Sequence, residues 1–252
     1  MEKIYKNFRI LVAEDYEKVS SMAADIIAKQ VSSKITSVLG LATGSTPVGA
    51  YQDLARLNKL GVVDFEKVTT FNLDEYYPIN KKNNQSYDYF MKDNLFNHIN
   101  IAPGNTFIPN GEAADAAKEC LEYESRIESA GGIDLQLLGI GLNGHIGFNE
   151  PADIFPQITH HVKLDDSTIK ANSRFFDNAN DVPKHALTMG VGTIMRSAQI
   201  LLLISGAGKA EIAQKVIFGD ITPKVPGTAL QLHRSVTVIL DKPAAEKVTP
   251  ML

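Results

Sequence analysis

The sequence has 252 residues but only one cysteine, no long apolar segment and no excess of positive charge. The single thiol, Cys120, excludes a disulfide framework, and its place among alanines on a helical pattern predicts a buried, reduced thiol in a cytoplasmic protein. The longest apolar run, at residues 200–204, is too short to cross a bilayer, and residues 1–9 lack the apolar region of a signal peptide. These absences argue against secretion and membrane insertion.

Charge and ligand spacing argue against two further classes of function. The net charge is -4 and the 25 Lys and Arg residues are scattered along the chain, so we expect no basic surface for nucleic acid or an anionic membrane. His160 and His161 are adjacent, but no His-x-x-x-His or carboxylate spacing accompanies them, so we expect no metal site. A small anionic molecule, held by local donors, remains as a partner.

What the sequence does contain is a regular alternation of short apolar runs and amphipathic segments. The apolar runs predict buried strands at residues 8–13, 37–42, 67–73, 133–140, 199–204 and 235–240. Helices are predicted after Asp15, after Pro47, around residues 90–95, at 112–129, from near Pro183, and at 208–218. Strands that alternate with helices predict one α/β domain over residues 1–252, with a doubly wound, mostly parallel, Rossmann-like sheet and helices on both faces. Residues 152–182 show little periodicity, and we interpret them as an active-site lid.

The most informative stretch is the glycine-rich segment at residues 139–151, which follows a predicted buried strand. It sets Asn143, His145 and Glu150 close together. Ligands of open α/β sheets bind at the carboxyl ends of the strands, so polar side chains here are well placed for chemistry. The alternative is a tight connection with a stray histidine. The flanking acid and amide favour a functional role for all three residues.

A second strand end leads into residues 43–47, Thr-Gly-Ser-Thr-Pro, at the predicted start of a helix. Free backbone N–H groups and the positive end of the helix dipole favour a phosphate there. The segment is not a P-loop because the Gly-Lys-Ser/Thr ending is missing, and the alternative interpretation is ordinary Ser/Thr capping of the helix. Candidate phosphate-binding residues in this segment are Thr43, Gly44, Ser45 and Thr46.

A third strand end leads into residues 205–209, Ser-Gly-Ala-Gly-Lys, which also open a helix. Lys209 would place a full positive charge beside the same phosphate, although a lone lysine is more often a solvated surface residue. Two glycine-containing helix starts at strand ends predict a phosphomonoester ligand. Arg174, in the weakly periodic region, is a candidate for bidentate binding of that phosphate, and is otherwise a surface arginine.

Two adjacent acids, Asp74 and Glu75, follow the strand predicted at residues 67–73. One carboxylate there is suited to act as a general base on a bound substrate, although acids at a strand end are often solvated loop residues. Neighbouring side chains of an extended segment point in opposite directions, so at most one of the two faces the site. We predict that it is Asp74, partly on the basis of a family resemblance.

Several motifs resemble those of the glucosamine-6-phosphate deaminase family, over nearly the whole chain. The most specific is Gly-His-Ile-Gly-Phe-Asn-Glu-Pro at residues 144–151, and the others lie at residues 41–47, 71–76, 171–176 and 187–193. The related 6-phosphogluconolactonases share the fold but carry a turn more like Gly-His-Thr-Ala-Ser, which disfavours lactone hydrolysis. Members of the deaminase family are aldose–ketose isomerising enzymes that convert glucosamine 6-phosphate and water to fructose 6-phosphate and ammonia.

The resemblance implies a role for each candidate residue and calls for no cofactor. Asp74 would move a proton from C2 to C1, and His145 would open the sugar ring. Glu150 and Asn143 would orient and polarise that histidine. Some family members carry Asp in place of Asn143, so here more of the charge support falls to Glu150. The phosphate would be held by Ser45, Thr46, Arg174 and Lys209.

Two further expectations concern binding without turnover and regulation. The fold also resembles the sugar-phosphate-sensing domains of transcription regulators, but the first predicted strand begins by Phe8 and leaves no room for a helix-turn-helix. Larger, allosterically activated family members use an Arg and a Lys shortly after the Asn-Glu-Pro turn, and ungapped alignment places His160 and Val162 at those positions. We therefore expect hyperbolic kinetics and a monomer or small homo-oligomer.

Overall fold

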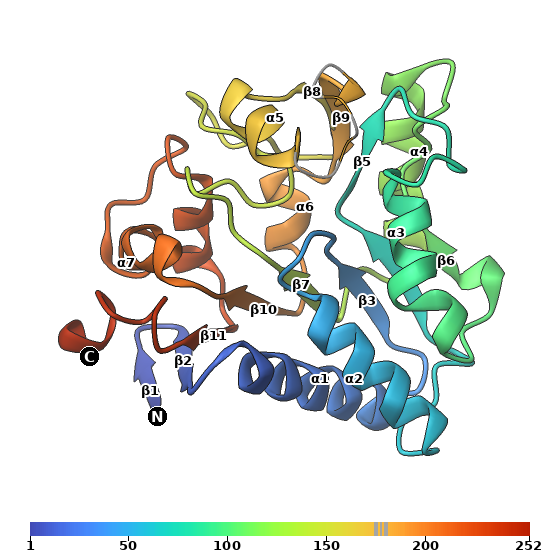
Figure 1. The fold of residues 1–252 in the computed structure, drawn as a ribbon. Helices are drawn as coiled ribbons and strands as arrows, with labels where there is room; N and C mark the ends of the chain where they lie inside the picture. The colour runs from blue at the N-terminus through green and yellow to red at the C-terminus, as the bar shows by residue number, and fades with distance from the viewer. Residues whose placement is uncertain (174–175, 177, 179–180) are drawn as a thin grey trace.

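The computed structural model describes residues 1–173, 176, 178 and 181–252, which form an α/β fold (Figure 1). The main sheet has eight strands, in the spatial order β1 (Glu2–Tyr5), β2 (Phe8–Ala13), β11 (Val236–Asp241), β10 (Gln199–Ile204), β7 (Leu135–Leu138), β3 (Val38–Leu41), β4 (Thr69–Asn72) and β6 (Thr106–Phe107). β1 is antiparallel to β2, and all other neighbours are parallel. The predicted mostly parallel sheet is confirmed. The edge strand β1 was missed because its side chains are largely exposed and give no apolar run.

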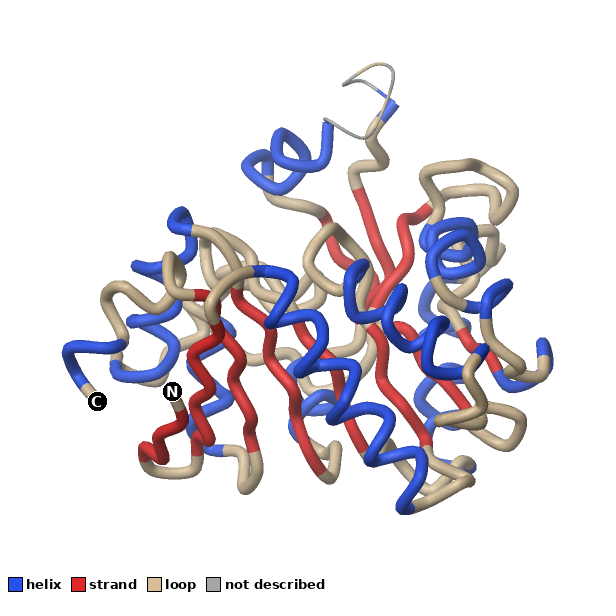
Figure 2. Tube along the Cα trace, turned by 60° about the horizontal axis from the view of Figure 1, so that its bottom comes forward, coloured by secondary structure: helices blue, strands red, loops and turns tan. Residues whose placement is uncertain are grey.

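Helices cover both faces of this sheet, as predicted. The helices of the described residues are α1 (Tyr16–Ser33), α2 (Val48–Lys59), α3 (Tyr87–Asn94), α4 (Ala116–Ser129), α5 (Asp166–Asn172), α6 (Val191–Met195) and α7 (Ala210–Phe218), of which α5 lies away from the main sheet (Figure 1). Short 3-10 helices include Phe96–His98, Pro103–Asn105, Ala207–Lys209, Pro226–Leu232 and Thr249–Met251. α1 and α2 lie side by side across one face (Figures 1 and 2). On the other face, Tyr123 of α4 packs edge-on against Phe71 of β4, with ring centroids 5.7 Å apart.

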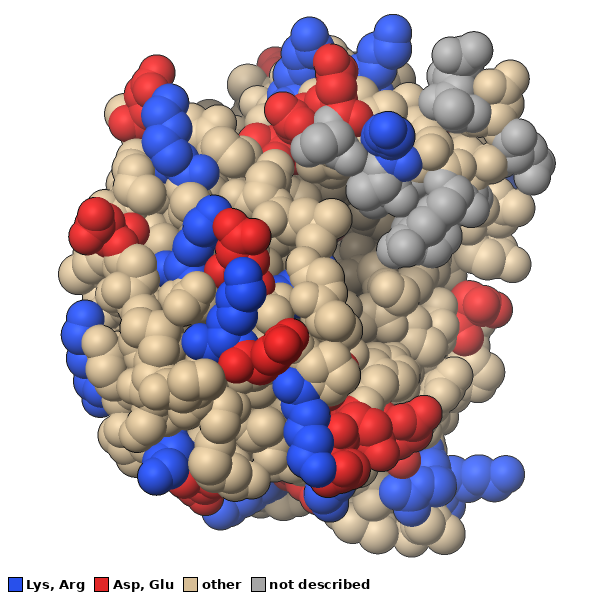
Figure 3. All heavy atoms as spheres, turned by 60° about the vertical axis from the view of Figure 1, so that its left-hand side comes forward, with Lys and Arg blue, Asp and Glu red and all other residues tan. Residues whose placement is uncertain are grey.

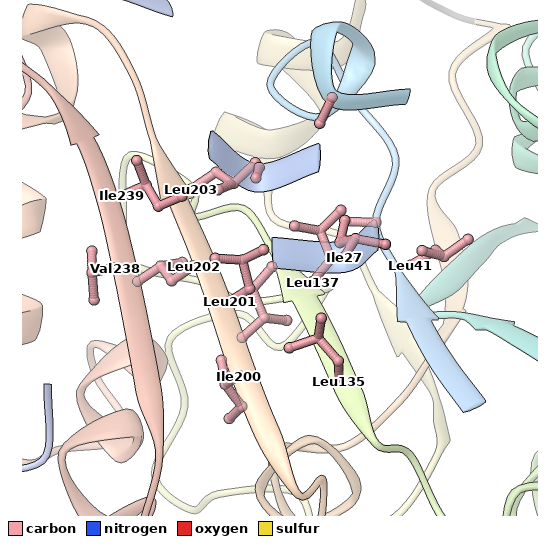
Figure 4. Close-up of a cluster of buried hydrophobic side chains, with 14 of the residues drawn as sticks. Ile27, Leu41, Leu135, Leu137, Ile200, Leu201, Leu202, Leu203, Val238 and Ile239 are labelled. Atoms are coloured by element: carbon pink, nitrogen blue, oxygen red, sulfur yellow. The ribbon is translucent and has the colours of Figure 1, made fainter. Parts of the chain in front are cut away.

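Large apolar side chains fill the space between the central strands and α1 (Figure 4). Ile27 of α1 lies against Leu41 of β3 and Leu137 of β7 (Figure 4). Every residue of β7 is buried, and so is every residue of β10 after Gln199. Runs buried on both faces are typical of parallel strands between two helical layers, and each such large apolar side chain contributes about 1.5–3 kcal/mol. The core therefore fixes where these strands end, and so where their loops begin.

A second, three-stranded antiparallel sheet has the order β5 (Asp74–Tyr77), β9 (His185–Thr188) and β8 (His160–Lys163). The chain passes from β4 into this sheet through a bend at Leu73, immediately before Asp74. The helix predicted from near Pro183 is wrong, because β9 lies there and α6 begins only at Val191. β9 is defined by its pairing with β5 and β8, which local apolar spacing does not encode.

Residues 152–182 are more regular than their sequence suggested, since they contain β8 and α5. Both elements were missed because β8 alternates between half-buried and exposed side chains and α5 is short and polar. In β8, His160 and Val162 share one face, and His161 and Lys163 share the other.

The remaining features of the fold are its surface charges and its single thiol. On the face shown in Figure 3, Lys and Arg are interspersed with Asp and Glu. None of the helices in the described part of the chain has the length and apolarity needed to cross a membrane. Cys120 is buried as predicted, and burial, with Glu119 and Glu124, raises the pKa of its thiol to about 11. The thiol is therefore protonated, and unreactive as a nucleophile, near neutral pH.

Candidate active site

Three loops meet at the carboxyl ends of β3, β7 and β10, which are neighbours in the main sheet. They are residues 43–47, 139–151 and 205–209, the three segments that the sequence analysis identified separately. Lys209 connects two of them, because its Nζ donates a hydrogen bond of 2.6 Å to the carbonyl oxygen of Ile140. The order of the parallel strands thus assembles three sequence-distant loops into one site.

A cavity of about 410 Å³ lies between the first and third loops. Its lining consists of Tyr16, Ser45, Thr46, Val48 and Ser205. Tyr16 also fixes the first loop, since its hydroxyl donates to the carbonyl of Ser45 at 3.1 Å and accepts from the N–H of Gly49 at 2.9 Å. Pockets for small molecules have volumes of about 300–1,000 Å³, so the cavity is large enough for part of a phosphosugar.

The side chains of Ser45 and Thr46 do not cap the helix that follows them. The N-cap residue of α2 is Pro47, which makes no side-chain capping hydrogen bond, and the N–H of Gly49 in the first turn is bonded by Tyr16. The interpretation of this segment as ordinary Ser/Thr capping is therefore wrong. Gly44 has a φ of +94°, a conformation that favours glycine and exposes its backbone. The segment presents hydroxyls and backbone N–H groups to the cavity at the start of a helix.

The third loop is held in place by Asp241, which sequence reasoning missed. The carboxylate of Asp241 accepts hydrogen bonds from the Ser205 hydroxyl, from the N–H of Gly206 at 2.8 Å, and from the N–H of Ala244 at 2.8 Å. Asp241 is 4% exposed and is the last residue of β11. An acid directly after the last predicted strand was the signal that could have identified it, since the same rule identified the other loops.

Glycines give the central turn its close packing. A Cβ at Gly141 would lie 2.3–2.4 Å from atoms of the His145 ring, so only glycine lets the imidazole occupy that position. Gly144 has a φ of +86°, and a Cβ there would lie 2.5 Å from Val225. The N–H of Gly141 donates to the carbonyl of His145 at 2.9 Å. The turn is thereby closed around the imidazole.

Asn143, His145 and Glu150 form one network, as their spacing suggested. The Asn143 amide donates to Oε2 of Glu150 at 2.8 Å, and its Oδ1 accepts the backbone N–H of His145 at 3.1 Å. Oε2 of Glu150 lies 3.3 Å from Nδ1 of His145, close enough for an ion pair but out of line for a hydrogen bond. Asn143 therefore orients both the acid and the histidine main chain without adding a charge.

Thr168 of α5 is a further member of this network, and its hydroxyl donates to Oε1 of Glu150 at 2.5 Å. Burial alone would raise the pKa of Glu150. Its close approach to His145, together with hydrogen bonds from Thr168 and Asn143, lowers this pKa below its usual value. Glu150 is therefore ionised near neutral pH and places a negative charge 3.3 Å from Nδ1 of His145. Thr168 lies in a polar stretch where no local pattern distinguishes it, so it could not be predicted from its neighbours.

Asp74 and Glu75 are both buried, but they face different partners. A Cβ at Gly147 would lie 3.4 Å from Oδ2 of Asp74, which places this carboxylate against the central turn. Glu75 instead accepts backbone N–H groups from Tyr76, Tyr87 and Asp88. Burial, and secondarily the charge of Glu75, raises the pKa of Asp74 well above its usual value. The opposed orientation expected for the two acids is observed, with Asp74 toward the turn.

Arg174 and Thr43 are the remaining candidates from the sequence. Arg174 lies outside the described residues. Thr43 lies beside Tyr87, with which its side chain hydrogen-bonds. In the described part of the chain, no group of three or more His, Cys, Asp or Glu residues is arranged to hold a metal ion.

Comparison with known proteins identifies the family to which this chain belongs. The model of the family described as glucosamine-6-phosphate isomerases/6-phosphogluconolactonase matches residues 13–239. The chain belongs to this family. It is 56% identical over 242 residues to a glucosamine-6-phosphate deaminase of Clostridioides difficile, covering 96% of this chain and 97% of the relative. It is 53% identical to the glucosamine-6-phosphate deaminase of Clostridium botulinum, over 95% of this chain and 98% of the relative.

Solved structures of the family separate its two branches. A structure described as a monomeric glucosamine-6-phosphate deaminase superposes with a TM-score of 0.92 at 47% identity, covering 94% of this chain and 99% of that one. The 6-phosphogluconolactonase from Leishmania guyanensis superposes with a TM-score of 0.75 at 19% identity, covering 95% and 98%. The second likeness shows the shared fold alone, whereas the first extends to the sequence.

Proposed function

We propose that this chain is a glucosamine-6-phosphate deaminase that converts glucosamine 6-phosphate and water to fructose 6-phosphate and ammonia. The observation that carries the proposal is the meeting of Asp74 with the network of Asn143, His145 and Glu150 at one end of the sheet, beside two loops suited to phosphate. The relatives at 56% and 53% identity carry this name.

The first chemical step is opening of the sugar ring. A closed aminopyranose has no carbonyl or iminium group, so the hydrogen at C2 is not acidic until the ring opens. His145 accepts the proton of the C1 hydroxyl as the C1–O5 bond breaks, and the ring oxygen takes up a proton in return. Glu150, ionised and held by Asn143 and Thr168, stabilises the imidazolium formed during this step.

The second step is proton transfer by Asp74. The carboxylate removes the proton from C2 to give an enolamine and returns it at C1, which leaves an imine at C2. Water adds to the imine, and ammonia leaves. No electrons are gained or lost in this sequence, so the chemistry calls for no redox cofactor. Burial of Asp74 raises its pKa and makes its ionised form a stronger base for a weakly acidic C–H.

The phosphate of the substrate anchors it at the other two loops. Thr43, Gly44, Ser45 and Thr46 offer hydroxyls and backbone N–H groups, and Lys209 offers its ammonium group. Arg174 is proposed as a further phosphate ligand on sequence grounds. Because both loops are fixed, by Tyr16 in one case and Asp241 in the other, the phosphate site is rigid before the substrate binds.

Residues 152–182 are proposed to act as a lid. The support is the bond from Thr168 in α5 to Glu150, which ties this segment to the catalytic turn. Closure of such a segment would exclude water until the imine has formed.

The cellular location, pathway and partners of the enzyme are proposed from its substrate. We propose that it acts in the cytoplasm, in the catabolism of amino sugars such as N-acetylglucosamine, with a phosphosugar as its ligand and neither nucleic acid nor a membrane as a partner. We also propose a monomer or small homo-oligomer with hyperbolic kinetics. Allosterically activated family members use an Arg and a Lys where this chain has His160 and Val162, and the Val162 side chain cannot donate a hydrogen bond.

Two alternatives are a non-catalytic sugar-phosphate-sensing domain and a 6-phosphogluconolactonase-type hydrolase. The test is to incubate the purified protein with glucosamine 6-phosphate and excess EDTA and to measure fructose 6-phosphate. The proposal expects turnover in EDTA. Binding without product would favour the sensing domain, and hydrolysis of 6-phosphogluconolactone alone would favour the hydrolase. Product only after a divalent ion is restored would contradict the mechanism.

A further inference from the structure

The central turn, at residues 139–151, is docked onto the three-stranded sheet. The backbone N–H of Phe148 donates a hydrogen bond of 3.0 Å to the hydroxyl of Thr188, the last residue of β9. The side-chain amide of Asn149 donates to the carbonyl oxygen of Met189 at 2.8 Å. All four residues are buried, so both bonds are shielded from water. The second half of the turn is thus tied to the end of one strand.

The same strand end also holds Asp74. Asp74 pairs directly with Thr188 across the antiparallel ladder of β5 and β9, so the two side chains lie on the same face of the sheet. The N–H of Met189 donates to the carbonyl oxygen of Leu73 at 2.7 Å, which fixes the bend from which β5 starts. Thr188 therefore has the proposed base as its neighbour within the sheet and the central turn as its hydrogen-bond partner.

Gly147 lets the turn approach this closely. It has a φ of +55°, and a Cβ there would lie 2.9 Å from the hydroxyl oxygen of Thr188 and 3.4 Å from Oδ2 of Asp74. A side chain at this position would meet both groups at once. The Thr188 hydroxyl and the Asp74 carboxylate thus face the same point of the central turn.

The Phe148 ring packs in the apolar core of the three-stranded sheet. Its centroid lies 5.7 Å from that of Tyr76 in β5, and it belongs to a small apolar cluster that includes Ala186 of β9. Tyr76 and Ala186 pair with each other and lie two residues along their strands from Asp74 and Thr188, so all four share one face. The hydrogen bond and the ring together fix this face against the turn.

We propose that Thr188 is a positioning residue for the proton transfer: its hydroxyl holds the central turn against β5 and so sets where the Asp74 carboxylate lies relative to His145 and the bound sugar. The inference rests on the proposed deaminase function, because it assigns Thr188 to the same site. Thr188 touches no reacting atom. Ring opening and proton transfer act in succession on C1 and C2 of one substrate, so the histidine and the base need a fixed separation.

The direct test is Thr188→Val, which keeps the size and branching of the side chain but removes the hydroxyl. The N–H of Phe148 loses its acceptor, and we expect kcat for glucosamine 6-phosphate to fall about 10-fold or more while KM changes less than about threefold, because the phosphate loops are untouched. Thr188→Ser keeps the hydroxyl and should restore kcat to within about threefold of the wild type. Wild-type kcat in Thr188→Val, or equal losses in the Val and Ser variants, would overturn the inference.

Thr70→Val is the matched control. Thr70 lies in β4 and is buried, and its hydroxyl has no hydrogen-bond partner among the described residues. The same exchange of a hydroxyl for a methyl group should therefore leave kcat and KM at their wild-type values. A loss of kcat in Thr70→Val equal to that in Thr188→Val would show a general response to a change in the core and would overturn the inference. Urea unfolding of each variant verifies that the fold is retained.

A second variant reaches the same contact from the turn, and it tests the inference even where Thr188→Val fails to fold. Gly147→Ala places a Cβ against the Thr188 hydroxyl and the Asp74 carboxylate, so it should push the turn away from the three-stranded sheet. We expect kcat to fall while KM changes little. Wild-type kcat in Gly147→Ala would show that the close approach is not needed for the reaction, which would overturn the inference.

A further readout does not depend on turnover. Amide hydrogen exchange of Phe148 is followed by NMR in protein that contains isotope-labelled phenylalanine, and its signal is identified by its absence in Phe148→Leu. In Thr188→Val the Phe148 N–H should exchange about 10-fold or more faster relative to the N–H of Phe8 in β2, whereas the ratio should stay constant in Thr70→Val. An unchanged ratio in Thr188→Val would overturn the inference. If the ratio changes as expected but the wild type releases no product, the deaminase function is refuted and the contact stands.

Discussion

Glu75 offers a quantitative test of the structure through the dependence of stability on pH. Burial, opposed by backbone hydrogen bonds from Tyr87, Asp88 and Tyr76, raises the pKa of Glu75 from 4.5 to about 7. The folded-state pKa is thus higher than that of the unfolded chain. Stability is greatest below the unfolded value, where Glu75 is protonated in both states, and it is lost as the pH rises toward the folded value. Glu75→Gln removes this dependence because the amide does not ionise.

The size of the effect follows from the shift. One pKa unit corresponds to about 1.4 kcal/mol, so a rise from 4.5 to about 7 corresponds to roughly 3 kcal/mol lost between acidic and neutral pH. Because Glu75 is 2% exposed, solvent screens little of this cost. The variant has its own constant penalty, since one of its amide hydrogens faces backbone donors, but that penalty does not vary with pH.

The assay is urea unfolding of wild type and Glu75→Gln at several values between about pH 4 and pH 8. The difference in unfolding free energy should change by roughly 3 kcal/mol in favour of the variant as the pH rises. Glu128→Gln, at an exposed position of α4, is the control and should show no such change. A difference between wild type and Glu75→Gln that stays constant across this range would refute the buried, raised pKa.

Four further outcomes are expected. Asp74→Asn keeps the shape but removes the base, so kcat should fall about 100-fold or more with little change in phosphate affinity. Thr168→Val removes the donor to Glu150, so kcat should fall and the acidic limb of the pH profile should move to higher pH, because the pKa of Glu150 rises. Asp241→Asn should raise KM about 10-fold with a smaller change in kcat, because it releases the loop at residues 205–209. Hydrogen exchange across residues 152–182 should slow when a phosphosugar analogue binds.

Each of these outcomes has a result that contradicts it. Near-full kcat in Asp74→Asn would show that another group is the base. An unshifted pH profile in Thr168→Val would mean that this hydroxyl does not support Glu150. If Asp241→Asn lowers kcat and leaves KM unchanged, the loop it holds is not a phosphate site. Unchanged exchange over residues 152–182 would exclude a closing lid.

The buried strands of the main sheet were predictable because each is a short apolar run that can be recognised from the local sequence alone. The run at residues 199–204 became β10, with only Gln199 exposed, because a strand covered on both faces must be apolar throughout. β9 was misjudged because its partners, β5 and β8, come from distant parts of the chain. Its residues carry no information about that pairing, and helix and strand are not separable in a short apolar run.

The residues of the candidate site also fall into two groups, those that the local sequence identified and those that it did not. Asn143, His145 and Glu150 were found because they lie in one turn, and Asp74 and Lys209 were found because polar residues stand where buried strands end. Thr168 was not found, because its role depends on where α5 packs rather than on its neighbours in the sequence. Asp241 was overlooked although the strand-end rule applied to it, since an acid after a strand is usually solvated, whereas this one is 4% exposed.

The measurement that tests the central claim most directly is the release of ammonia from glucosamine 6-phosphate, determined together with fructose 6-phosphate, with galactosamine 6-phosphate assayed in parallel. The account predicts that ammonia and fructose 6-phosphate appear in equal amounts and that both disappear in Asp74→Asn. Fructose 6-phosphate without ammonia, or ammonia release that persists at the wild-type rate in Asp74→Asn, would contradict a deamination driven by this site.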